Sequence, residues 1–139
     1  MPIIYWYGPE TIENQQCFVL VTEMLGPTLH DLFVHCNKDF SVSTVAVLAV
    51  KLVLESDQIE VIEAVHTKDY LHKNISPDQF CFGVGDKSHV LMLWNFSYAA
   101  LFRDAFSKNH IGYNEERIVT NYNIFTSVNV LSGIGRLAA

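Results

Sequence analysis

The longest regular pattern in the chain is a run of apolar residues at helical spacing between residues 41 and 66. Ser41 or Ser43 can cap the start of such a helix. The polar residues 55–58 interrupt it. The apolar run is too short to span a bilayer, so its side chains are predicted to lie in a core. The repeating positions are Val45, Leu48, Leu52, Ile59, Ile62 and Val65.

Strand-like segments precede this helix. Residues 3–7 are aromatic and β-branched and stop at Gly8-Pro9, which predicts a strand followed by a turn. Residues 10–16 are expected to form a polar loop. The apolar run at residues 17–22 predicts a strand that is buried on both faces.

Two further local patterns are well defined. Thr28 and Asp31 have the spacing of a capping box and predict a short helix that ends near His35. Residues 79–82 and 90–94 are apolar runs joined by a glycine-containing turn, which predicts a β-hairpin. The sequence therefore indicates a mixed fold of the α+β class.

Composition excludes several classes of protein. Half of the residues are apolar and 17% are charged, which is typical of a globular chain. The net charge is −6, and the basic residues form no stripe, so neither nucleic acid nor a membrane is expected as a partner. Cys17, Cys36 and Cys81 are far apart and predict buried, reduced thiols. The first residues lack the features of a secretory signal, so an intracellular location, cytoplasmic or nuclear, is expected.

Several short words occur in a fixed order along the chain. They are LGPTLHDLF at 25–33, VHTKDYLH at 65–72, FRD at 102–104, HIGY at 110–113 and SVN at 127–129, followed by Gly133-Ile134. The words LGPSLEDLF, VHTKNFIH, YRD, HIPY and SINxHLGI have the same order in casein kinase 1. The chain therefore resembles a serine/threonine protein kinase of the casein kinase 1 family.

The resemblance implies a partial protein-kinase-like fold over residues 1–139. Residues 1–25 would form the last small-lobe strands and the hinge, and residues 26–139 the upper helical large lobe. The resemblance covers about half of a kinase domain. Between residues 49 and 66 the chain is about six residues longer than the family, and we expect the extra residues to bulge out at 55–57. The glycine-rich loop, the strand lysine and the lower helices of the large lobe would fall outside the resemblance, so a truncated copy is expected.

The positions that carry phosphoryl transfer are altered. In the family an Asp accepts the substrate proton, while an Asn and a second Asp hold Mg²⁺. The aligned base position is Asn74, and Ser76 replaces a lysine that touches the phosphate. Gln79 replaces the metal-binding Asn, and Asn95 replaces the Asp of the DFG word. An amide is a poor base and a poor ligand for a hard cation. No metal site and no intact catalytic residue are therefore expected.

Some binding features do not depend on these side chains. The resemblance places Thr22 at the gatekeeper position and Glu23 and Leu25 at the hinge, where backbone groups would contact adenine weakly. His72 and Phe96 would pack in the interior. The family uses ATP and Mg²⁺, but no cofactor is expected to be required here.

Recognition of acidic substrates is also predicted to be weakened. Arg117 aligns with one basic position of the family, whereas Ile124 replaces an arginine. An isoleucine cannot pair with a phosphate group. The residues that read an acidic or phosphorylated substrate would therefore be incomplete.

Two functions remain open. The first is a pseudokinase-like fragment that acts as a binding or decoy module, with protein partners or chaperones binding an exposed apolar surface. The second is a serine/threonine kinase for acidic proteins, completed by a longer isoform or a partner. A longer reading frame that restores the strand lysine and the lower lobe would favour the second.

Overall fold

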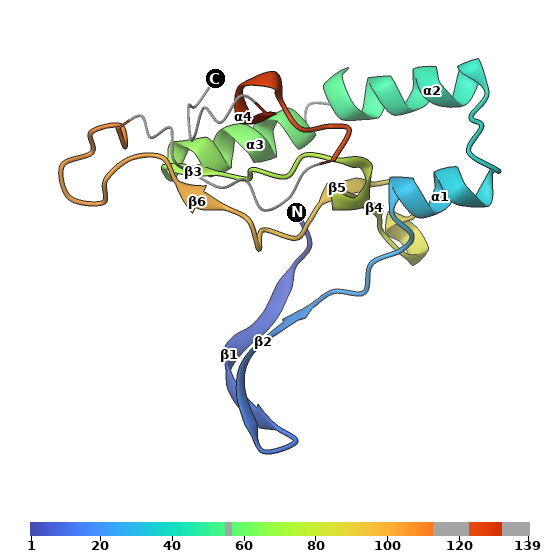
Figure 1. The fold of residues 1–139 in the computed structure, drawn as a ribbon. Coiled ribbons are helices and arrows are strands. Elements are labelled where there is room, and N and C mark those ends of the chain that lie inside the picture. The colour runs from blue at the N-terminus through green and yellow to red at the C-terminus, as the bar shows by residue number, and fades with distance from the viewer. Residues whose placement is uncertain (55–56, 113–122, 132–139) are drawn as a thin grey trace. The chain divides into compact units, whose positions relative to one another are not determined.

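The computed structural model describes residues 1–54, 57–112 and 123–131. Within this part the chain combines helices with three small antiparallel sheets of two strands each, so the predicted α+β class is confirmed (Figure 1). None of the helices in the described ranges is long and apolar enough to cross a membrane.

Contacts divide the chain into two compact units. The first consists of Met1–Gln58 and Pro77–Trp94, and the second of Ile59–Ser76 and Asn95–Ala139. Each unit is therefore built from two separate stretches of sequence.

The first unit begins with a long hairpin. β1 (Ile4–Ile12) pairs antiparallel with β2 (Gln15–Thr22). Glu13 and Asn14 connect them, and both have positive φ angles, of 50° and 63°. Positive φ at both central residues is the requirement of a type I′ turn, whose twist matches that of the strands.

The predicted turn at Gly8-Pro9 is therefore wrong, because β1 runs straight through these residues. Pro9 lies opposite Phe18 in the pairing. Proline lacks an N–H group and is tolerated in a strand that has an open edge. Gly8 has a separate role, since a Cβ there would lie 2.8 Å from the Trp6 ring.

The prediction that residues 17–22 are buried on both faces is also wrong. Cys17 and Val19 are partly covered, whereas Phe18 and Leu20 are 72% and 56% exposed. Among the described strands β2 pairs only with β1. Tyr7 stacks on Phe18 with ring centroids 5.8 Å apart.

The helix α1 (Leu29–His35) begins as predicted. The Thr28 hydroxyl accepts from the Asp31 amide at 3.0 Å, and the Thr28 amide donates to the Asp31 carboxylate at 2.9 Å. The Thr28 hydroxyl also donates to that carboxylate. The hydrogen bond from the Thr28 hydroxyl, followed by that from the Thr28 amide, holds the pKa of Asp31 below its usual value, since both bonds favour the charged carboxylate.

The predicted hairpin is formed by β4 (Phe80–Phe82) and β5 (Leu91–Leu93). The chain just before α1 runs along the other edge of β4. There the Gly26 amide donates to the Phe82 carbonyl at 2.7 Å, and the Phe82 amide donates to the Pro27 carbonyl at 3.1 Å. A Cβ on Gly26 would lie 2.9 Å from a backbone oxygen, so this close approach requires glycine.

The outer edge of β5 is closed by a side chain. Gln58 is 4% exposed, and its amide nitrogen donates to the Leu91 carbonyl. Its amide oxygen accepts from the Leu93 amide at 3.0 Å. The Gln58 side chain thus makes the two bonds that a neighbouring strand would make.

The buried core of the described residues is small. In the first unit it lies around this hairpin, with Leu29 added from α1. Cys81 is 1% exposed, and burial raises the pKa of its thiol. The prediction of buried thiols is correct for Cys81 and wrong for Cys36, which is exposed, while Cys17 is partly covered. The buried hydrophobic members around the hairpin are Leu29, Phe80, Cys81, Leu91, Met92 and Leu93.

The long helical pattern is broken earlier than predicted. α2 (Val42–Ala49) is capped by Ser41, whose hydroxyl accepts from the Thr44 amide at 3.1 Å. It continues into a π-helical turn over Val50–Leu54, and α3 covers Asp57–Thr67. A π-helical turn accommodates extra residues within a helix. Residues 55–56, where the bulge was expected, lie outside the described residues.

The prediction that the apolar stripe forms core is wrong for α2. No residue of α2 is buried, and Val45 is 52% exposed. Leu48 and Leu52 are partly covered, as are Ile62 and Val65. The stripe is therefore only partly covered by the described residues.

In the second unit β3 (Tyr70–Leu71) pairs antiparallel with β6 (Ala100–Leu101). The buried Phe102 follows β6, and its amide donates to the Asp69 carbonyl at 2.9 Å. The Phe102 ring lies against the rings of His66 and His110. The short helix α4 (Val128–Leu131) is the last described element.

We expect replacement of Gln58 to destabilise the protein strongly. Gln58→Ala leaves the Leu91 carbonyl and the Leu93 amide without a partner in a buried setting, at a cost of about 1–3 kcal/mol for each group. Urea unfolding measures the change. Gln15→Ala, at an exposed glutamine, is the control and should lie within about 0.5 kcal/mol of the unaltered protein. Equal effects of the two variants would contradict this role for Gln58.

Candidate functional site

In the segment predicted to be the hinge, the Glu23 side chain binds residues that are distant in the sequence. The Glu23 carboxylate accepts from the Ile3 amide at 2.7 Å and pairs with Lys87. The hydrogen bond from Lys87 is the main cause that keeps the pKa of Glu23 below its usual value, and the Ile3 amide adds to it. This side chain therefore ties the start of β1, the end of β2 and the β4–β5 turn together.

The backbone groups expected to face adenine are only partly available. The Thr22 hydroxyl donates to the Glu23 carbonyl at 3.0 Å, which uses one of the two lone pairs of that oxygen. Leu25 is partly covered, and Met24, which lies between Glu23 and Leu25, is 77% exposed. The Glu23 carbonyl thus keeps one lone pair for a further donor.

His72 and Phe96, which the resemblance places in the interior, lie in contact, although Phe96 is only partly covered. Their ring centroids are 4.7 Å apart with an edge-on arrangement, and His72 is 3% exposed. Edge-to-face aromatic pairs of this kind are stabilising. The contact joins the loop that carries Asn74 to the segment that carries Asn95.

Asn74, which the resemblance places at the base position, forms hydrogen bonds through both its backbone and its side chain. Its amide donates to Nδ1 of His72 at 3.4 Å, and its Oδ1 accepts from Nδ2 of Asn123 at 3.4 Å. A side-chain amide has no site basic enough to accept a substrate proton at neutral pH. The arrangement therefore fixes Asn74 in place without giving it the function of a base.

Asn95 forms a local turn with Ser97. Its Oδ1 accepts from the Ser97 amide at 3.4 Å and from the Ser97 hydroxyl at 2.5 Å. Its φ angle is 55°, a left-handed conformation that asparagine tolerates better than most residues. The oxygen that would face a metal ion is thus already bonded within the chain.

The other two altered positions are buried. Ser76 is 3% exposed and lies in the second unit, with Asn74 and Asn95. Gln79 is 6% exposed and lies in the first unit, in a short 3₁₀ turn, Pro77–Gln79. In the described part of the chain no donor reaches its Oε1 atom. The structure thus brings Asn74 and Asn95 into one unit and places Gln79 in the other.

This set of side chains does not fit Mg²⁺. The cation requires charged oxygen ligands in near-octahedral geometry, whereas these positions offer neutral amides and a hydroxyl. In the described ranges no group of three His, Cys, Asp or Glu side chains could hold a metal ion. We therefore assign no metal-dependent step to these residues.

A charged cluster supports the loop at residues 103–110. The Asp69 carboxylate accepts from the Lys108 ammonium at 2.8 Å and lies 3.5 Å from the Arg103 guanidinium. The hydrogen bond from Lys108 is the main cause that lowers the pKa of Asp69, and Arg103 adds to it. Arg103 and His110 also form a β-bridge, so the FRD and HIGY words are neighbours in space.

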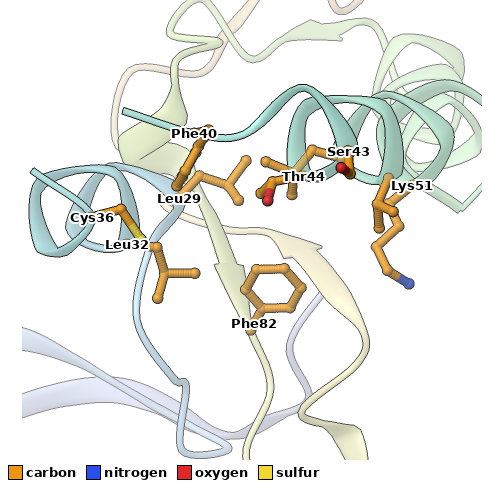
Figure 2. A pocket seen from close by; sticks show the side chains of 10 residues that line it. Leu29, Leu32, Cys36, Phe40, Ser43, Thr44, Lys51 and Phe82 are labelled. Atoms are coloured by element: carbon orange, nitrogen blue, oxygen red, sulfur yellow. The ribbon is translucent and has the colours of Figure 1, made fainter. Parts of the chain in front are cut away.

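A separate apolar pocket lies in the first unit, with a volume of about 450 Å³ (Figure 2). It contains neither the hinge residues nor the altered catalytic positions. Lys51 and Cys36 add the most reactive groups to its lining. α1, α2 and their neighbours supply the lining: Leu29, Leu32, Cys36, Phe40, Ser43, Thr44, Val47, Leu48, Lys51 and Phe82.

Sequence reasoning missed three partners. The role of Ser97 could have been predicted, because an Asn followed two residues later by a Ser is typical of a local turn. The roles of Asn123 and Gln58 could not, since their partners lie 49 and 33 residues away in the sequence. Ile124 is 92% exposed, whereas Arg117 and Gly133-Ile134 lie outside the described residues.

No known protein-family model matches the chain.

We expect Asp69 to make stability depend on pH. Its pKa is lower in the folded protein than the ordinary value of about 3.9, so its contribution is present above about pH 4. The contribution is lost as the pH falls through the lowered pKa. Asp69→Asn, which suits the φ of 65°, should be less stable than the unaltered protein at pH 7.

Urea unfolding at pH 7 and near pH 2–3 tests this. The difference between Asp69→Asn and the unaltered protein should shrink as the pH falls, because protonation of the Asp69 carboxylate removes its pairing with Lys108 and Arg103. Asp86→Asn, at an exposed turn residue, is the control and should show no such change. A difference that stays the same at low pH would contradict the assignment.

Proposed function

We propose that this chain is a casein kinase 1-like segment with a partial protein-kinase-like fold, and that it acts as a binding or decoy module without phosphotransfer. The observation that carries the proposal is the state of Asn74 and Asn95. Each has a neutral amide at a position where phosphoryl transfer requires a carboxylate. Each amide oxygen is also bonded within the chain.

The loss of several elements together makes turnover negligible. Removing one preorganised electrostatic element costs ~10²–10³ in rate, and protein kinases turn over at ~1–100 s⁻¹. The changes at Ser76 and Gln79 add to those at Asn74 and Asn95. The alternative, a serine/threonine kinase completed by a longer isoform or a partner, would still lack its base and its main metal ligand.

A binding module needs exposed apolar surface, and the described residues include such a surface on α2 and the π-helical turn. Apolar patches of this kind are typical of contacts with other proteins. We therefore propose protein partners or chaperones as the ligands of this segment. The exposed members are Val42, Val45, Val47, Val50 and Val53.

We expect no kinase activity. The purified chain is incubated with Mg²⁺, labelled ATP and an acidic protein substrate, and the incorporated phosphate is counted. The result should equal that of the Asn74→Ala variant, since Asn74 offers no base. Incorporation above this control would favour the kinase alternative.

Nucleotide binding is expected to be weak and independent of Mg²⁺, because only the backbone at Glu23 and Leu25 contributes. A thermal-shift titration with ATP, in Mg²⁺ and in EDTA, should give small and equal shifts, since a ligand stabilises the state that it binds. Asn95→Asp restores the carboxylate and is the variant in which a dependence on Mg²⁺ is expected. Such a dependence in the unaltered protein would argue against the proposal.

A further inference from the structure

The β1–β2 hairpin forms its hydrogen bonds within itself. Its two strands pair along their length, and the Glu23 amide adds a bond to the Ile3 carbonyl at 2.9 Å. In the described ranges, every hydrogen bond made by residues 1–22 ends on another residue of the segment 1–23. The polar contacts between the hairpin and the remainder of the first unit therefore begin at Glu23.

The Glu23 carboxylate makes this connection with both of its oxygens. Oε1 accepts from the Ile3 amide at 2.7 Å, and Oε2 accepts from the Lys87 ammonium. The hydrogen bond from Lys87 lowers the pKa of Glu23, so the carboxylate is charged at neutral pH. The Glu23 side chain is only 11% exposed, and water therefore competes little for its oxygens.

A short connector follows Glu23. Residues 23–27 belong to no helix or strand, and Met24 is 77% exposed. The backbone is bound again at Gly26, whose amide donates to the Phe82 carbonyl at 2.7 Å. Met24 and Leu25 are thus the only residues between two fixed points. A few irregular residues in such a position are sufficient for a hinge.

Lys87 extends from a closely packed turn. It ends a short 3₁₀ turn, Gly85–Lys87, that lies between β4 and β5. Its amide donates to the Val84 carbonyl at 3.2 Å, and its carbonyl accepts from the Val90 amide at 2.9 Å. A Cβ on Gly83 would lie 2.6 Å from the Lys87 carbonyl oxygen. The ammonium group is therefore carried by a fixed backbone, which belongs to the same β4–β5 pair that binds Gly26.

We propose that the ion pair of Glu23 and Lys87 is a latch that fixes the direction of the β1–β2 hairpin relative to the β4–β5 pair. When either side chain is neutralised, the hairpin turns as one body about Met24 and Leu25. The strand pairing is kept, because none of its bonds involves Lys87. The bond from the Ile3 amide is also kept in Glu23→Gln, since a side-chain amide oxygen accepts it equally well.

The strength of the pair suits a latch rather than a support of the whole fold. The Lys87 side chain is 46% exposed, and ion pairs with an exposed partner contribute little to global stability. Loss of the pair is therefore expected to change the direction of the hairpin without unfolding the protein. A bond that held the core together could not be released in this way.

Residual dipolar couplings measured by NMR test the latch, because the backbone amides of β1–β2 and of β4–β5 report their directions separately. In the unaltered protein one alignment tensor should describe both sets. In Glu23→Gln and in Lys87→Gln the β1–β2 couplings should require a second tensor of smaller magnitude, while the β1–β2 amides keep their protection from hydrogen exchange. Lys87→Arg keeps the charge and should retain the single tensor, as should Asp86→Asn, a control on the same turn.

The double variant Glu23→Gln/Lys87→Gln separates the pair from independent effects of its members. Because both single changes remove one interaction, the double variant should give the same hairpin tensor as either of them. A single tensor in both neutralised variants would overturn the proposal, as would two tensors in the unaltered protein. Loss of hydrogen-exchange protection in β1–β2 would also overturn it, since the pair would then support the hairpin itself and not its direction.

Discussion

The core of the first unit depends on hydrogen bonds to the backbone of a short, buried pair of strands, β4 and β5, along the outer edge of each strand. β4 and β5 are three residues long, so neither can leave a backbone group unpaired without a cost comparable to the stability gained by burying its side chains. The chain before α1 bonds to β4, and the Gln58 amide bonds to β5. Together these contacts cover both outer edges of the two-stranded sheet. The edge at Leu91 and Leu93 is closed, as the burial of Leu93 requires.

Structure formed by residues close in the sequence was predicted well, whereas the burial of side chains by distant residues was not. The capping box at Thr28 and the β4–β5 pair depend on residues close in sequence, and both are confirmed. The errors at Gly8-Pro9 and in β2 have different causes. The turn was predicted because a Gly-Pro pair commonly ends a strand, but a proline is tolerated within a strand that has an open edge. The burial of residues 17–22 was predicted from their continuous apolar run, but in the described residues Phe18 and Leu20 remain exposed.

The candidate site shows the same difference between local features, which were predicted, and long-range contacts, which were not. Sequence alone identified Asn74 and Asn95 as positions without a carboxylate, since that follows from the resemblance of the words around them. It did not show that the amides are engaged, because the donor to Asn74 is 49 residues away. In the described residues no donor reaches the buried Gln79 oxygen, and sequence reasoning could not show this either, since the burial of Gln79 depends on packing around its turn.

The hydrogen bonds of the Asn74 and Asn95 side chains determine what a substitution at either position would change. Asn74 and Asn95 both use their Oδ1 atoms as acceptors, and a carboxylate accepts the same bonds. An aspartate at either position would therefore keep each of these side-chain contacts and change only the charge. The absence of a carboxylate is thus not a requirement of the local packing. Under the proposed function, this separates two properties that a kinase combines in one residue, because the turn and the loop would keep their geometry without a base or a metal ligand.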